Sequence, residues 1–252
     1  MKYIASCSFG KDSIATILLA REHNEPLDEI VYCEVMFDKY ISGELPEHKD
    51  FIYNKAIPTF EIWGYKVTVL HSEKTYKDIF YRVKKRGNYI GKIYGFPPTM
   101  RCWANGELKI PPIREYWKSQ PEDVMQYVGI AIDEPARLDR VVSSRNQMSL
   151  LEKYGYTERM AKEKCIEYDL LSPIYSFSNR GGCWFCQNQS LCQLKELRSV
   201  HPELWKILLD MQKESPHSFK IDYSIDKLEN RFMWEDRQVN LFDYAESLKK
   251  II

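Results

Sequence analysis

The stretch that decides the fold is Ser8-Phe9-Gly10-Lys11-Asp12-Ser13. Residues 3–7 before it form a short apolar-leaning run, which is typical of a buried parallel strand. Residues 14–22 after it are strong helix formers with an apolar stripe. A strand, a Gly/Ser turn and a helix direct several backbone N–H groups and a helix N-terminus at one point, and that geometry suits a phosphate.

The side chains of this turn fit the same purpose. Ser8 and Ser13 can donate hydroxyl groups, and Gly10 allows a ligand to approach the backbone closely. Lys11 supplies positive charge, whereas Asp12 repels a phosphate unless a divalent cation such as Mg²⁺ lies between them. The turn therefore predicts a site for a nucleotide with its metal. The structural alternative is a serine-rich helix cap.

Length and composition limit the class of protein. The 252 residues are enough for one domain with a small appendage. Lys+Arg and Asp+Glu balance at 36 each, so net charge indicates no acidic partner. No apolar run approaches the roughly 18 residues of a membrane span, and the first run is too short for a signal peptide. Seven unevenly spaced cysteines do not indicate a secreted disulfide framework, so we expect a cytoplasmic protein without a membrane partner.

Strands and helices alternate along most of the chain. Apolar patterns predict strands at residues 3–7, 28–37, 65–71 and 125–132. Helical patterns cover residues 14–22, 47–63 and 157–168, the second limited to two pieces by Pro58 and the last capped by Thr157. Glycines and prolines, Pro111 and Pro112 among them, predict loops and short helices between residues 76 and 120.

This alternation predicts an α/β fold with a parallel, doubly wound sheet that is covered on both faces. In such a sheet the ligand lies beyond the carboxyl ends of the strands, where the turn at residues 8–13 is placed. The character of the chain changes near residue 175. We therefore expect a nucleotide-binding domain at residues 1–175 and a small, cysteine-rich, helical subdomain at residues 176–252.

Four segments, in the same order, resemble one known family. The first turn resembles the PP-loop, S-G-G-x-D-S, of the adenine nucleotide alpha hydrolase superfamily, with Phe9 in place of the first glycine. Residues 43–47, 101–112 and 129–140 resemble further motifs of its PAPS-reductase-like members. These motifs are G-x-E-x-P-E-T, C-T-x-x-L-K-x-x-P and G-I-R-A-D-E-S-x-R-R. Trp103 replaces a threonine and Ala131 replaces an arginine of these motifs.

The resemblance implies a HUP-like domain that binds ATP or a related adenine nucleotide with Mg²⁺. It implies that Lys11, Asp12 and Lys109 act in catalysis. The nucleotide-binding residues that it implies are Ser8, Phe9, Gly10, Lys11, Asp12, Ser13, Met36, Lys109, Asp133 and Arg137. The expected reaction is cleavage between the α- and β-phosphates with adenylation of an acceptor, followed by sulfur transfer. Solvated loop charges are the alternative for each of the three later segments.

A second strong pattern is Gly181-Gly182-Cys183-Trp184-Phe185-Cys186-Gln187-Asn188-Gln189-Ser190-Leu191-Cys192. Cys183 and Cys186 have the C-x-x-C spacing that lets one tight turn bind a metal with two thiolates, and Cys192 can add a third. Four cysteines suit an iron–sulfur cluster or a closed zinc site. The alternative is a redox-active pair or buried thiols.

The fourth ligand of this metal site is Cys102 or Cys165. Cys165 shares a helical face with Ala161, so it is also typical of a small core residue. Related APS reductases hold a 4Fe–4S cluster with cysteine from the segment that contains Cys102, and this resemblance favours Cys102. We expect Cys7 and Cys33 to be core thiols.

No cysteine follows Cys192, so the chain lacks the E-C-G-(I/L)-H ending of PAPS reductases proper. This absence disfavours reduction of a sulfonucleotide such as PAPS or APS, which is the second function to consider. The Gly-Gly-Cys-Trp-Phe-Cys version resembles PAPS-reductase-like proteins of phages and mobile elements, and more loosely the DNA phosphorothioation sulfurtransferases. Such chemistry implies a sulfur donor protein as a partner.

Basic and aromatic residues are interleaved between residues 82 and 114. Between these positions the sequence contains one acidic residue, Glu107. The basic residues are Arg82, Lys84, Lys85, Arg86, Lys92, Arg101, Lys109 and Arg114. This pattern is typical of a nucleic-acid surface, and a solvated lid over the active site explains it as well. The third function to consider is therefore a non-catalytic module that binds a nucleotide or nucleic acid and has a structural metal site.

Overall fold

The computed structural model describes residues 1–97 and 102–249, without the side chains of Val142 and of residues 239–249. Arg101 therefore lies outside the described residues. The chain forms two compact units, each of which draws on two segments. Unit 1 comprises residues 1–76 and 104–184, and unit 2 comprises residues 77–103 and 185–252. The expected division at residue 175 stays a prediction.

Unit 1 is built on a five-stranded sheet with the order β3-β2-β1-β4-β5, in which every pair of neighbours is parallel. The strands are β1 (Lys2–Ser6), β2 (Glu29–Glu34), β3 (Lys66–His71), β4 (Val124–Val128) and β5 (Gln147–Met148). The winding reverses between β1 and β4, which creates a crevice at the carboxyl ends of these two strands. The predicted α/β class with a doubly wound parallel sheet is confirmed.

Two of the strands are shorter than their sequence patterns predicted. β2 ends at Glu34 and β4 ends at Val128, although the apolar runs continue to Phe37 and Ile132. The remaining residues of each run leave the sheet and form loops at its carboxyl edge. These loops surround the end of β1, where the turn at residues 8–13 lies.

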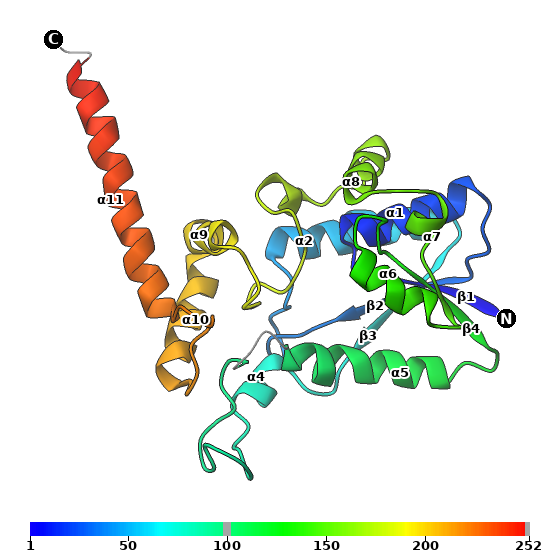
Figure 1. Ribbon diagram of the computed structural model, residues 1–252, viewed down its shortest axis with the longest axis horizontal. Helices are drawn as coiled ribbons and strands as arrows, with labels where there is room; N and C mark the ends of the chain where they lie inside the picture. The colour runs from blue at the N-terminus through cyan, green and yellow to red at the C-terminus, as the bar shows by residue number, and fades with distance from the viewer. Residues whose placement is uncertain (98–101, 250–252) are drawn as a thin grey trace. The chain divides into compact units, whose positions relative to one another are not determined.

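Helices cover both faces of the sheet (Figure 1). On one side lie α1 (Lys11–Glu22), α7 (Leu150–Lys153) and α8 (Glu158–Glu167), and on the other lies α5 (Ile110–Lys118). Nine of the twelve residues of α1 are buried because α7 and α8 pack over it. The remaining elements of unit 1 are α2 (Pro46–Phe51), α3 (Ile57–Ile62), α6 (Pro135–Val142) and a 3₁₀ turn at Pro173–Ser176.

Two π-helical turns correct the expectation that prolines interrupt the helices. The segment expected in two pieces is one continuous helical run, because a π turn at Ile52–Ala56 joins α2 to α3. The wider turn suits Pro58, which has no N–H and would crowd a carbonyl in a regular α-helix. A second π turn, Asn105–Lys109, precedes α5, and Pro111 and Pro112 begin that helix instead of breaking it.

Unit 2 is mainly helical. Its helices are α9 (Leu191–Val200), α10 (Pro202–Glu214) and α11 (Ile225–Lys249), and α4 (Tyr76–Phe80) enters it from unit 1. The apolar side chains Leu197, Leu204 and Leu208 of α9 and α10 are buried. Ser190 caps α9 through a reciprocal bond with Gln193. None of the helices in the described part of the chain is long and apolar enough to span a membrane.

Candidate nucleotide site

Phe9 anchors the turn that joins β1 to α1. Its φ of 56° lies in the left-handed region, which costs a residue other than glycine roughly 1 kcal/mol. The ring is fully buried, 5.1 Å from the ring of Tyr32 and 6.1 Å from that of Phe60. Burial of an aromatic side chain offsets the backbone cost. Phe9 therefore has a backbone conformation that glycine would readily adopt and adds a contact with the core.

The hydroxyl of Ser13 forms hydrogen bonds inside the same turn. Its Oγ donates to the carbonyl of Gly10 at 2.9 Å and accepts from the N–H of Ser8 at 3.2 Å. The Cys7 thiol accepts from the N–H of Phe9 at 3.3 Å. The hydroxyl of Ser13 is thus occupied inside the turn, whereas Ser8 is exposed at its surface.

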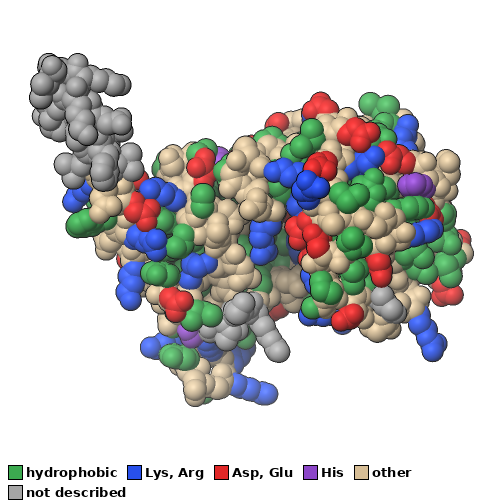
Figure 2. All heavy atoms as spheres, turned by 45° about the horizontal axis from the view of Figure 1, so that its top comes forward, with side chains coloured by type: hydrophobic (Ala, Val, Ile, Leu, Met, Phe, Trp, Pro, Cys, Tyr) green, Lys and Arg blue, Asp and Glu red, His purple; other side chains and the backbone are tan. Residues whose placement is uncertain are grey.

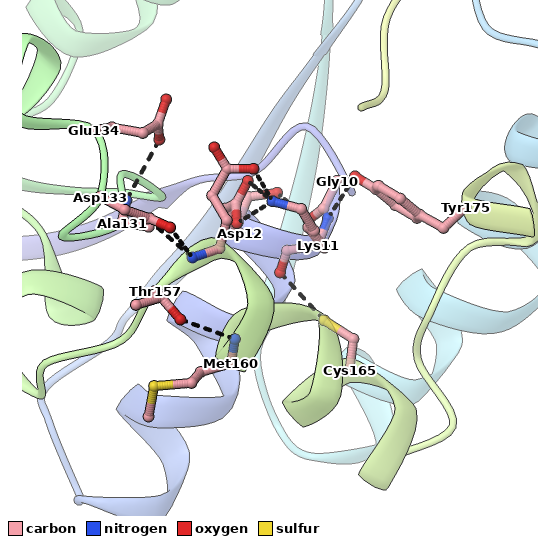
Figure 3. Close-up of polar contacts among 12 residues, drawn as sticks. Gly10, Lys11, Asp12, Ala131, Asp133, Glu134, Thr157, Met160, Cys165 and Tyr175 are labelled. Atoms are coloured by element: carbon pink, nitrogen blue, oxygen red, sulfur yellow. Dashed lines mark hydrogen bonds and ion pairs between the residues drawn. The ribbon is translucent and has the colours of Figure 1, made fainter. Parts of the chain in front are cut away.

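Lys11 is a buried cation between two carboxylates (Figure 3). Its Nζ lies 2.7 Å from Oδ1 of Asp12 and 2.8 Å from Oε2 of Glu158, and only 6% of the side chain is exposed. Burial alone would lower the pKa of Lys11, but the hydrogen bonds to the two carboxylates outweigh it, so the pKa is raised. Glu158 begins α8 and was not among the expected site residues.

The carboxylates around Lys11 are under-neutralised. Burial raises the pKa of Asp12 despite the opposing effect of Lys11, and the charges of Glu158 and Glu134 raise it further. Side chains of Asp12 and Glu158 are 24% and 44% exposed, so a ligand can reach their oxygens. Carboxylate oxygens are the donors that Mg²⁺ prefers, and the surplus negative charge favours a cation. The residues present therefore fit Mg²⁺.

The N-terminus of α1 has no side-chain cap of its own. Gly10, its N-cap residue, has an extended conformation, and the first helical N–H, that of Lys11, donates to the hydroxyl of Tyr175 at 2.9 Å. Tyr175 lies in the 3₁₀ turn, and burial raises the pKa of its hydroxyl to about 12. This hydroxyl accepts a hydrogen bond from an amide that could otherwise bind an anion.

Gly129 brings β4 against the first turn of α1. A Cβ at this position would lie 2.6 Å from the backbone nitrogen of Ser13 and 2.7 Å from the carbonyl carbon of Asp12. Only glycine allows this approach without movement of the backbone. The end of β4 therefore supports the turn from the other side of the crevice.

Two further expected residues, Asp133 and Arg137, lie in the loop and helix after β4. The carboxylate of Asp133 accepts from the N–H of Glu158, the first residue of α8, at 3.0 Å (Figure 3). Arg137 pairs with Glu134, whose carboxylate also accepts from the N–H of Ala131 at 3.4 Å. The structure thus brings Lys11, Asp12 and Asp133 into one cluster.

The other two expected residues, Met36 and Lys109, lie beyond the end of β2. Met36 pairs with Ser42 in an isolated bridge, and its carbonyl accepts from the N–H of Tyr76 at 2.9 Å. Lys109 ends the second π turn, and its carbonyl lies 3.8 Å from the sulfur of Cys33. The charge of Lys109 counteracts burial, which raises the pKa of Cys33 to about 11.

Gly43 and Glu44, which open the G-E-L-P-E segment after β2, are buried and well connected. Glu44 accepts from the hydroxyl of Tyr32 at 3.2 Å, and His48 lies 2.8 Å from the hydroxyl of Ser172. Burial lowers the pKa of His48, which keeps the ring neutral at physiological pH. The N–H of Trp184 donates to the carbonyl of Gly43 at 2.8 Å. This hydrogen bond fixes the loop that contains Cys183 to the segment after β2.

The predicted metal ligands are divided between the units: Cys183 belongs to unit 1, and Cys102, Cys186 and Cys192 belong to unit 2. Across residues 1–97 and 102–249, no group of three or more Cys, His, Asp or Glu is arranged to hold a metal ion. The four-cysteine site for a 4Fe–4S cluster or zinc therefore stays a prediction.

The remaining cysteines belong to the core of unit 1. Cys165 is fully buried, its thiol donates to the carbonyl of Lys11 at 3.2 Å, and burial raises its pKa to about 12. Its interpretation as a small core residue is therefore confirmed. Cys7 and Cys33 are buried too, and burial raises the pKa of each to about 11.

The sequence matches no protein-family model and no curated protein. Among solved structures, the chain is similar to a U34-tRNA thiolase, NcsA from Methanococcus maripaludis, solved with its 4Fe–4S cluster. The two share 14% identity with a TM-score of 0.42, and the likeness covers 84% of this chain and 71% of the thiolase. A likeness at this level supports no conclusion about family, ligand or reaction.

Proposed function

We propose that unit 1 binds an adenine nucleotide, ATP or a close relative, with Mg²⁺ at the N-terminus of α1. The observation that carries this proposal is the buried ammonium of Lys11, held between Asp12 and Glu158 at the crevice between β1 and β4. A buried cation beside helix amides suits a polyphosphate, and the surplus carboxylates suit its metal. The PP-loop resemblance of residues 8–13 supports adenine as the base.

We infer that the reaction is attack on the α-phosphate. An oxygen of the acceptor forms a bond to the α-phosphorus, the bond to the bridging oxygen breaks, and pyrophosphate leaves with the electron pair. Bound Mg²⁺ would neutralise phosphate charge. Lys11 stabilises negative charge that develops on the phosphate oxygens, and Gly129 and Phe9 fix the turn that presents the amides.

The adenylated acceptor is the activated species of this proposal. A sulfur nucleophile, such as a hydrosulfide supplied by a donor protein, attacks the activated carbon and displaces AMP. Lys109 and Arg137 are proposed to approach the phosphates when the nucleotide is bound.

Isothermal titration with MgATP, together with analysis of the released phosphates, tests the proposal. We expect binding that requires Mg²⁺ and is lost in Asp12→Asn, with pyrophosphate as the product. Asp139→Asn on the exposed face of α6 is the matched control and keeps full affinity. Absence of MgATP binding to the wild-type protein, or release of inorganic phosphate in place of pyrophosphate, would contradict the proposal.

A further inference from the structure

Unit 2 contains a basic hairpin, residues 82–94, whereas the residues of the nucleotide site belong to unit 1. Residues 79–97 contain five Lys or Arg residues and no Asp or Glu, in a chain whose total charge is balanced. Val83 and Ile93 form an antiparallel bridge, and the N–H of Lys84 donates to the carbonyl of Lys92 at 2.9 Å. The basic residues therefore gather on one short hairpin. Blue side chains mark it at the bottom of Figure 2.

The base of this hairpin is rigid. The ring of Phe96 packs 5.1 Å from that of Phe80 and 5.1 Å from that of Phe219. Its N–H donates to Oγ of Ser215 at 3.0 Å, and a Cβ on Gly95 would lie 2.5 Å from the same oxygen. The hairpin thus projects from a packed base next to the end of α10.

Two lysines of the hairpin, Lys84 and Lys92, lie against aromatic rings. Lys84 lies 5.2 Å from the ring centre of Tyr89 and 5.6 Å from that of Tyr94, and Lys92 lies 5.7 Å from that of Tyr89. Within the described residues, no carboxylate forms an ion pair with Lys84, Lys85, Arg86 or Lys92. Nζ of Lys84 lies 3.0 Å from Nε2 of His217, whose pKa is lowered by burial and by the charge of Lys84. No carboxylate in the described part of the chain neutralises these four cations, so their charge is available to an anionic ligand.

Tyr89 at the tip is unusual in two respects. Its φ is 72°, a left-handed conformation that glycine or asparagine adopts at lower cost, and 49% of the residue is exposed. Neighbouring Ile90 is 67% exposed. The ring of Tyr89 packs edge-on against His217, with 5.2 Å between the ring centroids, and its exposed part is available to contact a partner.

We propose that the hairpin at residues 82–94 binds single-stranded nucleic acid, with the cations on phosphates and the ring of Tyr89 on an unpaired base. An acidic protein could also satisfy the cations, but an exposed ring among them matches the alternation of phosphate and base along a strand. A duplex offers phosphates without unpaired base faces. The proposal rests on unit 2 alone and is independent of the nucleotide site.

Fluorescence anisotropy with labelled single-stranded 20-mers, one RNA and one DNA, and a blunt duplex of the same sequence tests the proposal. We expect single strands to bind at least about tenfold tighter than the duplex. The affinity should fall with salt, with a log–log slope near −0.7 for each phosphate contacted. Lys85→Glu combined with Arg86→Glu should weaken single-strand binding at least about tenfold and reduce that slope by about 1.4.

Two matched variants control for charge and folding. Lys206→Glu with Lys227→Glu makes the same charge change on exposed positions of α10 and α11 and is expected to bind as the wild type does. Tyr89→Asn keeps a residue that tolerates the left-handed backbone, so it stays folded but loses about tenfold in single-strand affinity. Tyr40→Asn, at a position that is 87% exposed in unit 1, leaves binding unchanged.

Several results would overturn the proposal. Wild-type protein that binds neither oligonucleotide excludes it. Equal affinity for duplex and single strands, or equal loss in the control charge variant, would show non-specific attraction. Heparin binding with the same dependence on Tyr89 would show a general polyanion surface. A change in MgATP affinity of the Lys85/Arg86 variant, with oligonucleotide binding intact, would assign the hairpin to the nucleotide site instead.

Discussion

Unit 1 contains two buried ionic clusters, one around Lys11 beyond the end of β1 and one around Glu29 at the start of β2. The carboxylate of Glu29 is fully buried. Its partners are Lys2 at 2.5 Å, Lys66 at 2.8 Å, Tyr116 at 2.6 Å and the hydroxyl of Thr68. Lys11, in contrast, is a single cation shared by two partly exposed carboxylates.

The pKa shifts separate the two clusters. Burial opposes ionisation of Glu29, but its four donors outweigh burial and lower its pKa to about 2. Burial likewise opposes ionisation of Asp12, and there the single cation does not outweigh it, so the pKa of Asp12 is raised. A buried carboxylate whose donors outweigh burial, as at Glu29, stabilises the fold. Partly exposed carboxylates that share a single cation, as around Lys11, are prepared for a ligand.

Substitution of Lys11 should have the largest effect on function. In Lys11→Met the two carboxylates can turn to water, so we expect a small change in stability. Turnover with MgATP should fall about 10³-fold because a cation that stabilises the phosphoryl charge is lost. Pyrophosphate release and thermal unfolding measure both effects, with Lys118→Met on the exposed part of α5 as control. Full activity of Lys11→Met would contradict a role of the Lys11 cluster in catalysis.

Substitution of Glu29 should lower the stability of the protein and leave its turnover unchanged. Glu29→Gln should lower the free energy of unfolding by about 2–3 kcal/mol at pH 7 and leave the turnover of the folded protein unchanged. Because the folded pKa is about 2 and the ordinary value is 4.5, this stability is present above pH 4.5 and is lost as the pH falls toward 2. Urea unfolding between pH 2 and 7 measures it. An acid limb that is the same in wild type and variant would refute the assignment.

Gly129 tests whether the turn depends on close approach of β4. Gly129→Ala places a methyl group 2.6 Å from the nitrogen of Ser13, so we expect stability to fall by about 1–3 kcal/mol and MgATP affinity to fall with it. Gly106→Ala is the control, since its Cβ would meet nothing within 4 Å and alanine favours the helix. Equal effects of the two substitutions on stability and MgATP affinity would show that the turn does not depend on the close approach of the backbone at Gly129.

Tyr175 gives the smallest and most specific test. Tyr175→Phe leaves the N–H of Lys11 without its acceptor, which should lower the stability of the free protein by about 1 kcal/mol. The same change frees this amide for the nucleotide, so MgATP affinity measured by calorimetry should rise a few-fold. Weaker binding would mean that the hydroxyl contacts the ligand directly.

Local patterns in the sequence were sufficient for four of the five strands and for the main helix of the site, whereas the two-residue strand β5 was missed. The apolar runs located the four principal strands, and Thr157 was predicted correctly as the cap of α8. The run of helix formers after the first turn identified α1. The π turns were missed because a proline in a helical pattern normally indicates an end, and the sequence does not show that a wider turn can accommodate it.

The complete site could not be predicted because two of its residues come from distant parts of the chain. Glu158 is 147 positions from Lys11, and Tyr175 is 164 positions away. Their contacts depend on how α8 and the 3₁₀ turn pack against α1, and no local pattern encodes that. Phe9 also differed from the family motif, and only its backbone conformation explains how it replaces glycine.

The buried ring of Phe9 affects how the turn at residues 8–13 binds and selects a ligand. The turn cannot open locally unless this ring leaves the space between Tyr32 and Phe60, so its order is tied to the cooperative unfolding of unit 1. A receptor that is already ordered loses little conformational entropy on association. Discrimination among ligands at this turn is then decided by shape and charge, and not by the ability to fold a loop.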